Sequence, residues 1–298
     1  MAPVVVVGRF DGVHLGHQHL LREARRAGET VVAYTFPPRG PSLLTLGAKV
    51  HLLRRHADAV EVVPWERVEA LDPEAFVREE LRGRLGATAV AVGPDHRFGR
   101  DRAGDVATLK GLGGRLGLAV HVVPPFCLDG APVSSGRVRD LVRAGEVEGA
   151  GRLLGRPPWV VGHPVPGARL ARRLGYPTVN LDLAPELVRP RAGVYAAWAH
   201  FPGGEGPALF YLGDRPTFPS LPPSAELHLL TPPEREVHGP VEVHLLAFLR
   251  PDTRFPTREA LADQIGKDVA LGQRILNHSP IPRRLLPSGE LRSADRSP

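Results

Sequence analysis

The 298-residue sequence predicts an α/β domain followed by a β domain. In the first half, apolar strand-like runs alternate with helical segments, which implies right-handed crossovers and a parallel sheet with helices on both faces. In the second half, short apolar runs alternate with Gly/Pro turns and have no helices between them, which favours an antiparallel β-barrel. The chain is longer than a usual single core, so two domains are expected.

Composition narrows the class of protein. Cys127 is the single cysteine, which excludes an internal disulfide or a cysteine-based metal cluster and favours a reducing cytoplasm. The sequence has no apolar run of about 18 residues and no charged leader, so neither a membrane span nor a signal peptide is expected. The formal net charge of +6 comes mainly from scattered arginines. A nucleic-acid binder more often clusters basic residues with aromatics. We therefore expect a cytoplasmic monomer or weak homo-oligomer with polyphosphate ligands and no nucleic-acid or membrane partner.

The chain opens on a strand, a glycine turn and the start of a helix. The valines of Val4–Val7 suit a strand buried on both faces, and Gly8 and Gly16 let backbone approach a ligand closely. A helix N-terminus offers N–H groups and a positive dipole end to an anion such as a triphosphate. His14 and His17 have a spacing that places both rings on one helical face, where they can bind phosphate oxygens and stabilise a leaving pyrophosphate. The alternative is a pair of capping or surface histidines. The sequence contains neither G-x-G-x-x-G nor a Walker lysine motif, which argues against a dehydrogenase or a P-loop enzyme.

The first half continues as alternating strands and helices. We expect strands at 30–36, 59–63, 88–93 and 118–123. The opening helix should end near residue 28, and further helices are expected at 49–56, 73–85, 106–116 and from 135 to about 145. Two loops follow strands at the edge of the sheet where the opening turn lies. The loop 93–105 is rich in glycine and arginine and suits an anion, although a solvated turn is the alternative. In the other loop, Ser134 and Ser135 can simply cap a helix, and Arg139 could bind a phosphate with two hydrogen bonds.

These motifs resemble the adenylyltransferase half of bacterial bifunctional riboflavin kinase/FAD synthetases. The chain has, in order, G-R-F-D-G-V-H-L-G-H, T-F-P-P, G-P-D-H-R-F-G and S-S-G-R-V-R. The resemblance implies a Rossmann-like nucleotidyltransferase sheet in which His14 and His17 are catalytic and hold ATP phosphates. The further residues implied to bind ATP are Gly8, Phe10, Asp11, Gly16, Ser134, Ser135 and Arg139, and those implied to bind flavin are Phe36, Asp95 and Phe98. The chain departs from the family at His96, Gly136 and Arg39, where phenylalanine, threonine and histidine are usual.

A break at Pro157-Pro158 ends the first domain, because proline cannot continue a helix and restricts the residue before it. We expect domains at 1–156 and 157–278, and a disordered tail at 279–298. The second domain has strand-like runs at 159–161, 193–200, 208–212, 225–230 and 241–249. Residues 258–276 form the one long predicted helix of this half. Its apolar face is expected to consist of Leu261, Ile265, Val269 and Ile275.

The second half resembles riboflavin kinases. L-G-Y-P-T-V-N at 174–180 is similar to their L-G-F-P-T-A-N motif, and G-V-Y, G-D-R-P-T-F and E-L-H follow in family order. On residue type alone, Thr178 and Asn180 offer hard oxygen ligands of the kind that Mg²⁺ takes, and Glu226 could accept a proton from a hydroxyl group. A solvated arginine-rich hairpin and a surface glutamate are the alternatives.

The second resemblance also implies specific contacts. Glu226 would be the catalytic base, and Thr178 and Asn180 would bind Mg²⁺. The residues implied to bind ATP are Gly162, Gly167, Arg172, Gly175, Pro177, Thr178 and Asn180, and those implied to bind flavin are Gly193, Val194 and Tyr195. Ala171 and Tyr211 depart from the family, where glycine and asparagine are usual.

Across residues 4–276 the resemblance implies two linked reactions. ATP would phosphorylate riboflavin to FMN, and AMP from a second ATP would then join FMN to give FAD and pyrophosphate. The implied partners are riboflavin, FMN, FAD and ATP, with Mg²⁺ as cofactor. Three alternatives remain at this point. They are an enzyme with one active half and one binding half, a flavin-binding transcriptional regulator, and an adenylyltransferase for nicotinate or pantetheine precursors. The regulator would need a DNA-reading helix, and the second domain argues against the last alternative.

Overall fold

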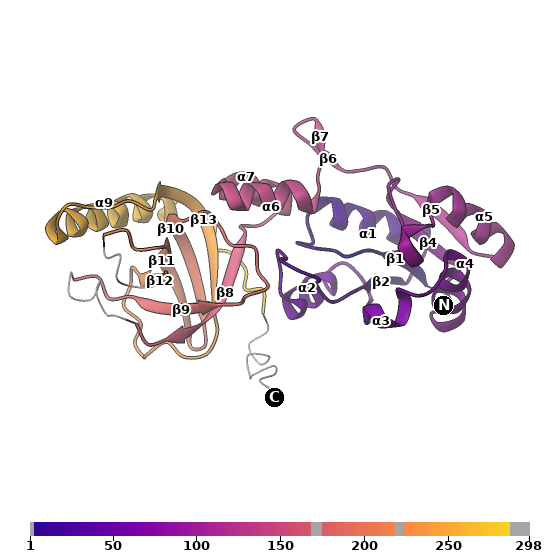
Figure 1. Cartoon of the computed structure of the whole chain (residues 1–298), viewed down its shortest axis with the longest axis horizontal. Helices are drawn as coiled ribbons and strands as arrows, with labels where there is room; N and C mark the ends of the chain where they lie inside the picture. The colour runs from indigo at the N-terminus through magenta and orange to yellow at the C-terminus, as the bar shows by residue number, and fades with distance from the viewer. Residues whose placement is uncertain (1–2, 168–174, 218–222, 287–298) are drawn as a thin grey trace. The chain divides into compact units, whose positions relative to one another are not determined.

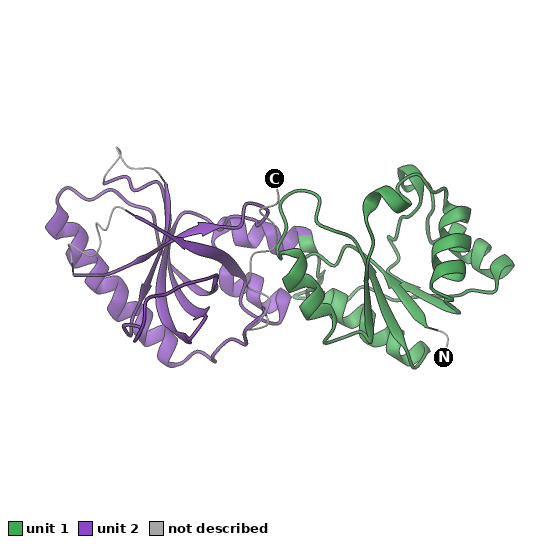
Figure 2. Cartoon of the chain, turned by 90° about the horizontal axis from the view of Figure 1, so that it is seen from below, with its two compact units in different colours: residues 1–135 green, residues 136–298 purple. Residues whose placement is uncertain are grey.

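The computed structural model describes residues 3–167, 175–217 and 223–286. They divide into two compact units, residues 1–135 and 136–298 (Figures 1 and 2). Arg172, which the sequence predicts to contact ATP, and Ala171 lie outside the described residues.

The first unit contains the predicted parallel sheet. Its strands are β1 (Val4–Val7), β2 (Val31–Thr35), β3 (Ala59–Val62), β4 (Ala89–Val92) and β5 (Ala119–Val122). Within the described part of the chain they pair in parallel in the order β3-β2-β1-β4-β5 (Figure 1). The order reverses direction at β1, where ligands bind in open α/β sheets, beyond the carboxyl ends of the strands. Val4–Val7 is buried along its whole length, as expected of a central strand.

Helical segments connect these strands. They are α1 (Leu15–Ala27), α2 (Leu46–Leu53), α3 (Trp65–Val68), α4 (Pro73–Ala75), η1 (Phe76–Arg84), the short 3₁₀ turn η2 (Arg100–Arg102) and α5 (Val106–Leu116). Helix α2 begins earlier than predicted because the Thr45 hydroxyl accepts a hydrogen bond from the Ala48 N–H and caps it. The segment expected as one α-helix at 73–85 is mostly π-helical, because Phe76–Arg84 widens to i→i+5 bonding. A two-stranded hairpin, β6 (Cys127–Leu128) and β7 (Ala131–Pro132), precedes the last residues of the unit.

The second unit contains the predicted antiparallel barrel. Its strands are β8 (Trp159–Val165), β9 (Val179–Leu183), β10 (Gly193–Phe201), β11 (Gly204–Gly213), β12 (Ser224–Leu229) and β13 (Val241–Pro251). The described residues close it in the order β10-β11-β12-β9-β8-β13, because β13 pairs with both β8 and β10. β9 was not predicted, since Asn180 and Asp182 interrupt its apolar residues.

The long helix predicted after the barrel is α9 (Arg258–Asn277), which packs against β10, β11 and β13 (Figure 1). The face predicted to cover the barrel is only partly right. The fully buried positions of α9 are Asp268, Gly272 and Leu276, whereas Val269 and Ile275 are half-buried. The predicted Leu261 and Ile265 line the pocket against the barrel, whereas the most buried positions, Asp268 and Gly272, were missed because an aspartate and a glycine do not count toward an apolar face.

Two helices expected in the first domain belong to the second unit. These are α6 (Ser135–Ala144), apart from its first residue, and α7 (Val147–Leu154). Val147 is part of the apolar core of the barrel, and the Arg191 N–H donates to the Val142 carbonyl at 3.3 Å. The boundary between the units therefore falls between residues 135 and 136, at the start of α6. The predicted boundary after residue 156 lies within the second unit.

The prediction of a disordered tail is wrong for residues 279–286. Leu285 is buried, and the backbone N–H groups of Leu285 and Leu286 both donate to the Glu242 carboxylate at 2.9 Å. Glu242 is fully buried on β13, so a carboxylate in that position requires such donors. The polar, proline-rich composition of the segment concealed this anchoring.

Candidate active sites

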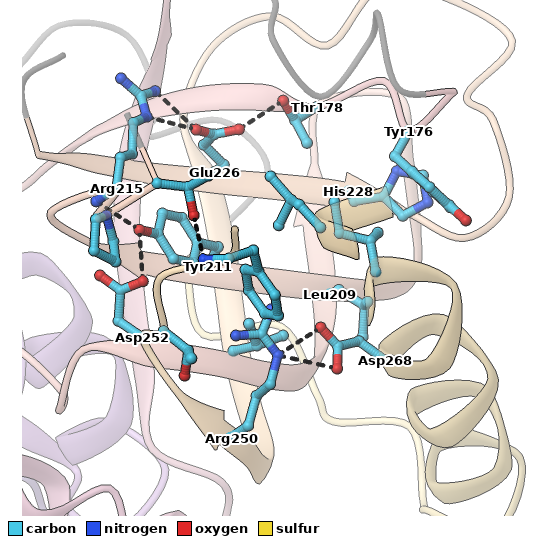
Figure 3. Close-up of a pocket in the computed structure, with 17 residues that line it drawn as sticks. Tyr176, Thr178, Leu209, Tyr211, Arg215, Glu226, His228, Arg250, Asp252 and Asp268 are labelled. Atoms are coloured by element: carbon cyan, nitrogen blue, oxygen red, sulfur yellow. Dashed lines mark hydrogen bonds and ion pairs between the residues drawn. The ribbon is translucent and has the colours of Figure 1, made fainter. Parts of the chain in front are cut away.

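A pocket opens between the barrel and α9, which we call the barrel pocket (Figure 3). One part of its wall is apolar and comes from the barrel, the loop before α9 and α9 itself. Another part is polar and comes from the residues just before β9, from β11 and the segment after it, from β12, from the end of β13 and from α9. The apolar residues include Val194, Leu209, Phe255, Leu261 and Ile265, and the polar ones include Thr178, Tyr211, Arg215, Glu226, His228, Arg250, Asp252 and Asp268.

Glu226 is held from several sides in this wall. Its Oε2 accepts a hydrogen bond from the Thr178 hydroxyl at 3.0 Å. Its Oε1 accepts two hydrogen bonds from Arg215, from Nε at 3.0 Å and from Nη2 at 2.7 Å, and one from the Ser224 hydroxyl at 3.1 Å. Figure 3 shows the carboxylate between Arg215 and Thr178. The pairing with a guanidinium fork fixes the orientation of the carboxylate as well as its charge.

Arg215 also borders a second pocket, lined in part by Gly167, Asn180 and Asp214. Its Nη2 donates to the Asn180 Oδ1 at 3.1 Å. The backbone of Arg215 has a φ of 53°, a left-handed conformation that costs about 1–3 kcal/mol for a residue other than glycine. The Tyr211 hydroxyl accepts the Arg215 N–H at 2.8 Å and supports this conformation. The strained residue thus joins the walls of both pockets.

Two further polar pairs in the barrel pocket were not predicted from the sequence. Arg250 donates through Nε to both carboxylate oxygens of Asp268, at 2.8 and 3.1 Å, and Tyr211 donates to Asp252 at 3.1 Å. Burial raises the pKa of Tyr211, to which the nearby Asp252 carboxylate adds, so its hydroxyl stays protonated. A signal for Asp268 existed, because it follows Leu261 and Ile265 at helical spacing on the inward face of α9.

The remaining residues predicted for this half lie in different environments. Pro177 presents its carbonyl to the His228 ring at 2.8 Å, and a side chain on Gly167 would overlap the Asn180 amide. Gly162 is buried on β8, and Gly175 is exposed with a φ of 89°.

The three residues predicted to bind flavin in the barrel have separate roles. Val194 lines the barrel pocket. Tyr195, in contrast, is fully buried in the barrel core, and its hydroxyl donates to the Arg191 carbonyl. Gly193 has no room for a side chain, because a Cβ would overlap the Arg250 carbonyl and the Phe248 ring. The structure therefore gives Gly193 and Tyr195 packing roles.

In the first unit, the turn after β1 has an unusual backbone. Phe10, Gly12 and Val13 have φ values of 49°, 84° and 41°. For Phe10 and Val13 this conformation is strained, and both side chains are fully buried, which holds them in place. Strain of this kind persists only where the surroundings determine it, as at ligand-binding turns.

His14 and His17 lie together at the start of α1, as predicted. His14 is the N-cap, and its Nδ1 accepts the His17 N–H at 3.3 Å. The two rings stack with their centroids 3.6 Å apart, and Phe10 packs edge-on against His17 at 5.2 Å. The imidazoles therefore occupy the helix N-terminus, where an anion is favoured.

Other predicted residues of the opening site hold the turn. The Asp11 carboxylate accepts the Leu43 N–H at 2.7 Å, and the Ser135 hydroxyl donates to the Asp11 carbonyl at 2.8 Å. Gly8 donates to the Tyr34 carbonyl at 3.0 Å, and a Cβ at Gly16 would lie 3.0 Å from the Val133 carbonyl. Ser134 directly precedes α6, and Arg139 lies on α6 in the second unit.

The residues predicted to bind flavin in the first unit follow neighbouring strands of the sheet. Phe36 directly follows β2 and stacks on Trp65 at 4.2 Å. Asp95 is exposed after β4, whereas Phe98 is buried in the same apolar core as Phe36. The parallel strands bring Phe36 and Asp95 to the sheet edge that carries the opening turn. The two buried phenylalanine rings pack in the core.

His96 and Arg39, two departures from the family pattern, also lie in this region. His96 stacks on Phe98 at 5.7 Å, and burial, with Arg102 adding to the effect, lowers the pKa of His96 to about 4. His96 is thus a neutral aromatic ring at pH 7. The Arg39 guanidinium lies 4.8 Å from the centre of the Trp65 ring and pairs with Glu69 at 2.6 Å.

Comparison with known protein families accounts for both halves of the chain. A family model described as FAD synthetase matches residues 2–137, and one described as riboflavin kinase matches residues 154–276. Each match covers one of the two sites described above.

Curated relatives match over nearly the whole length. A bifunctional riboflavin kinase/FMN adenylyltransferase of Haemophilus influenzae is 31% identical, over 92% of this chain and 94% of the relative. Proteins of the same description from Pseudomonas fluorescens and Escherichia coli K12 are 34% and 32% identical, over 91% and 89% of this chain and 92% and 90% of the relatives.

A solved structure from Streptococcus pneumoniae shares the fold. It is described as a macrolide-efflux protein and is 27% identical, with a TM-score of 0.81 over 91% of this chain and 94% of that one. Within the described segments of this chain, no helix has the length and apolar character to cross a membrane.

Proposed function

Because this chain belongs to the bifunctional riboflavin kinase/FMN adenylyltransferase family, it phosphorylates riboflavin to FMN and adenylylates FMN to FAD, and we propose which residues carry each reaction. The kinase reaction is assigned to the barrel pocket and its neighbour, and adenylyl transfer to the turn before α1. The observation that carries the kinase assignment is the Glu226 carboxylate, hydrogen-bonded to Thr178 and Arg215 in the pocket wall.

For the kinase reaction, riboflavin occupies the barrel pocket and ATP the pocket beside Asn180. The apolar part of the barrel pocket suits the flavin ring, and its polar part receives the ribityl chain. Glu226 accepts the proton of the terminal ribityl hydroxyl as that oxygen attacks the γ-phosphorus of ATP and ADP leaves. Arg215 and Thr178 keep the carboxylate aimed, and Arg215 also presents positive charge to both pockets.

Magnesium fits the donors next to Glu226. Thr178 supplies a hydroxyl oxygen and Asn180 an amide oxygen, and both lie on or next to the start of β9. Mg²⁺ prefers such hard oxygen ligands and is usually completed by substrate phosphates rather than by a full protein cage. The bound ion would neutralise charge on the ATP phosphates. The described residues contain no cluster of three or more His, Cys, Asp or Glu side chains able to hold a metal by themselves.

For adenylyl transfer, a phosphate oxygen of FMN attacks the α-phosphorus of ATP and pyrophosphate leaves. His14 and His17 donate hydrogen bonds to the phosphates and stabilise the charge that develops on the leaving group. The strained backbone from Phe10 to Val13 and the N-terminus of α1 supply a fixed, electropositive surface for the same phosphates. Phe36 and Asp95, at the same sheet edge, contact the flavin.

We also infer a cytoplasmic location and a monomer or weak homo-oligomer. Cys127 is exposed and is the single cysteine, which suits a reducing compartment. Each proposed site takes its residues from one chain. Fractionation of cells and light scattering after gel filtration would test these two inferences.

The assignment of two active halves is tested by incubating the purified protein with riboflavin, ATP and Mg²⁺ and separating the flavins by chromatography. We expect FMN to appear first and FAD to follow. A parallel reaction that starts from FMN isolates the second step. If FMN alone accumulates from riboflavin and added FMN is not converted, the first half serves only as a binding module and its assignment is wrong.

A further inference from the structure

Lys49 is a buried lysine on α2 that is only 3% exposed. Its ammonium donates hydrogen bonds to two backbone carbonyls, that of Arg9 at 3.2 Å and that of Phe36. Burial lowers the pKa of Lys49 to about 8. The negative charge of Asp11 opposes this shift, and the positive charge of Arg9 adds to it. Burying an ammonium group is unfavourable unless its N–H groups are hydrogen-bonded.

The Arg9 carbonyl lies at the beginning of the strained turn. It accepts a second hydrogen bond from the buried Thr35 hydroxyl at 3.3 Å. The peptide bond is planar and trans, so the C=O of Arg9 and the N–H of Phe10 point in opposite directions. With the carbonyl held against Lys49 and Thr35, the Phe10 N–H is directed away from them. The ammonium therefore fixes the orientation of the first peptide of the turn that precedes His14.

The Phe36 carbonyl lies at the end of β2, on the segment assigned to flavin. Lys49 therefore connects the nucleotide turn to the flavin segment through one side chain. Helix α2 is a firm support for it, because Thr45 caps the helix and Leu52 and Leu53 are buried. A displacement of about 1 Å between reacting groups can cost about a hundredfold in rate, so a fixed spacing of this kind matters for group transfer.

We propose that Lys49 is a positioning residue for adenylyl transfer, whose buried ammonium clamps the turn after β1 to the end of β2. The clamp keeps the backbone that binds ATP phosphates at a set distance from the segment that binds FMN. This proposal rests on the assignment of the turn and Phe36 to the adenylyltransferase site. Lys49 itself contacts neither substrate.

The first test compares three variants of the full chain. Lys49→Met removes the charge with little change in length, and Lys49→Arg keeps a permanent charge. Lys110→Met is the matched control, because Lys110 is an exposed lysine of the same unit. We expect Lys49→Met to lower kcat/KM for FMN adenylylation by about a hundredfold. Riboflavin phosphorylation by the same molecules should be unchanged, Lys49→Arg should recover part of the loss, and Lys110→Met should match the wild type.

The second test is the pH profile, which a purely structural lysine would not alter and which needs no variant to fold. In the wild type, adenylylation relative to phosphorylation should fall as the pH rises through about 8, because hydrogen bonds from a neutral amine are weaker than those from an ammonium. Asp11 and Arg9, on the turn, are the charged groups that set this pKa. In Lys49→Arg the alkaline fall should disappear, because the guanidinium stays protonated.

Two results would overturn the proposal. One is full adenylylation by Lys49→Met, and the other is the same alkaline profile in the wild type and Lys49→Arg. A His14→Ala variant separates this failure from failure of the site. If His14→Ala loses adenylylation and Lys49→Met keeps full activity, the assignment of the site holds and the proposed role of Lys49 is wrong. Full activity in both removes the assignment of the turn as well.

Discussion

At the scale of single residues, the carboxylate of Glu226 is held by more donors than a surface carboxylate would be. Thr178, Arg215 and Ser224 all donate to it, so its position is set before substrate arrives. Such preorganisation removes the need to reorient the base during the reaction. In the proposed mechanism, these contacts would hold the Glu226 carboxylate in a fixed orientation toward the ribityl hydroxyl.

Glu226→Gln should keep the shape of this site but lose the proton acceptor. We expect riboflavin phosphorylation to fall by about 10²–10⁴-fold while adenylylation of added FMN persists. Glu236→Gln, at an exposed glutamate of the same unit, is the control and should behave as wild type. Separate assays of the two steps give the answer, and a near-normal kinase rate in Glu226→Gln would remove Glu226 from the mechanism.

His14→Ala and His17→Ala should have the opposite pattern. Loss of hydrogen bonds to the leaving pyrophosphate is expected to slow FAD formation by about 10²–10³-fold, with phosphorylation of riboflavin intact. His14→Ala should also destabilise the first unit by about 1 kcal/mol, because His14 caps α1. His19→Ala, on the same helix, is the matched control for the assay of FAD. Equal losses of both activities would point to misfolding instead.

At the scale of elements, α9 does more than cover the barrel. Its inward face contributes Leu261 and Ile265 to the pocket wall and places Asp268 against Arg250 of β13. Gln264 donates to Asp268 at 2.8 Å as well, so the aspartate is satisfied from both its own helix and the barrel. The Arg250–Asp268 ion pair thus fixes α9 to β13 next to the pocket that α9 lines.

Asp268→Ala should therefore weaken both the fold and the kinase. Arg250 would lose its carboxylate partner in a largely buried position, at a cost of about 1.5–3 kcal/mol in the unfolding free energy. Urea titration measures the stability, and the KM for riboflavin should rise because α9 forms part of the pocket. Asp263→Ala, at an exposed position of α9, should change neither quantity. Equal stability of the two variants would show that the Asp268 pair contributes nothing.

The C-terminal segment is the second element with an unexpected role. A fragment of residues 135–286 keeps α6, α7, the barrel, α9 and the donors to Glu242, and we expect it to fold and phosphorylate riboflavin. A fragment ending at residue 277 leaves Glu242 buried without the Leu285 and Leu286 N–H groups, which should cost about 1–3 kcal/mol or more. Circular dichroism and kinase assays compare the fragments. If the shorter one is equally stable, the segment is not an anchor.

At the scale of the whole molecule, stability should depend on pH through the buried pair of Glu242 and His244. Burial raises the pKa of Glu242, but the nearby His244 ring and hydrogen bonds from the Leu285 and Leu286 N–H groups outweigh it and hold the pKa below its usual value. Burial lowers the pKa of His244 and outweighs the attraction of Glu242. Both shifts favour the deprotonated form in the folded state. Each group therefore adds to the unfolding free energy at high pH, and this contribution is lost as the pH falls.

The contribution of His244 to the unfolding free energy should be complete above a pH of about 6.5, which is the ordinary pKa of a histidine in an unfolded chain, and should decline below that pH. We expect the urea midpoint of the barrel unit, followed by tryptophan fluorescence, to decrease between pH 7 and pH 5. His244→Gln cannot be protonated in this range and should show a shallower decrease. Parallel curves for the two proteins would exclude His244 as the source.

Much of this architecture could be predicted from the sequence, because strand and helix periods are local properties. The valines of β1, the glycine turn and the histidine pair were all visible, and so was the change to short strands after Pro157-Pro158. Three features were not. The π-helical widening at Phe76–Arg84 has no period that distinguishes it from an α-helix, β9 has too few apolar residues, and α7 packs through Val147 onto strands far along the chain.

The sites divide in the same way. Residues within contiguous motifs, such as Thr178, Asn180 and Glu226, could be named from the sequence. The helical spacing of Asp268 from Leu261 and Ile265 carried a signal, but its pairing with Arg250 could not be foreseen, because the two residues meet only when α9 folds onto β13. Of the G-V-Y motif only Val194 lines the pocket, because the alternation of β10 turns the Tyr195 ring into the core.

The closure of the barrel has a consequence for how the chain is made. The parallel sheet of the first unit is complete once β5 ends at Val122, and domains at the N-terminus can fold while synthesis continues. The barrel, in contrast, joins its two ends only through β13, which pairs with β8 and with β10. Until residue 251 has left the ribosome, β8 and β10 remain open edges that can pair with other strands. Ribosome-bound chains stopped before β13 should therefore make FAD from FMN but not FMN from riboflavin.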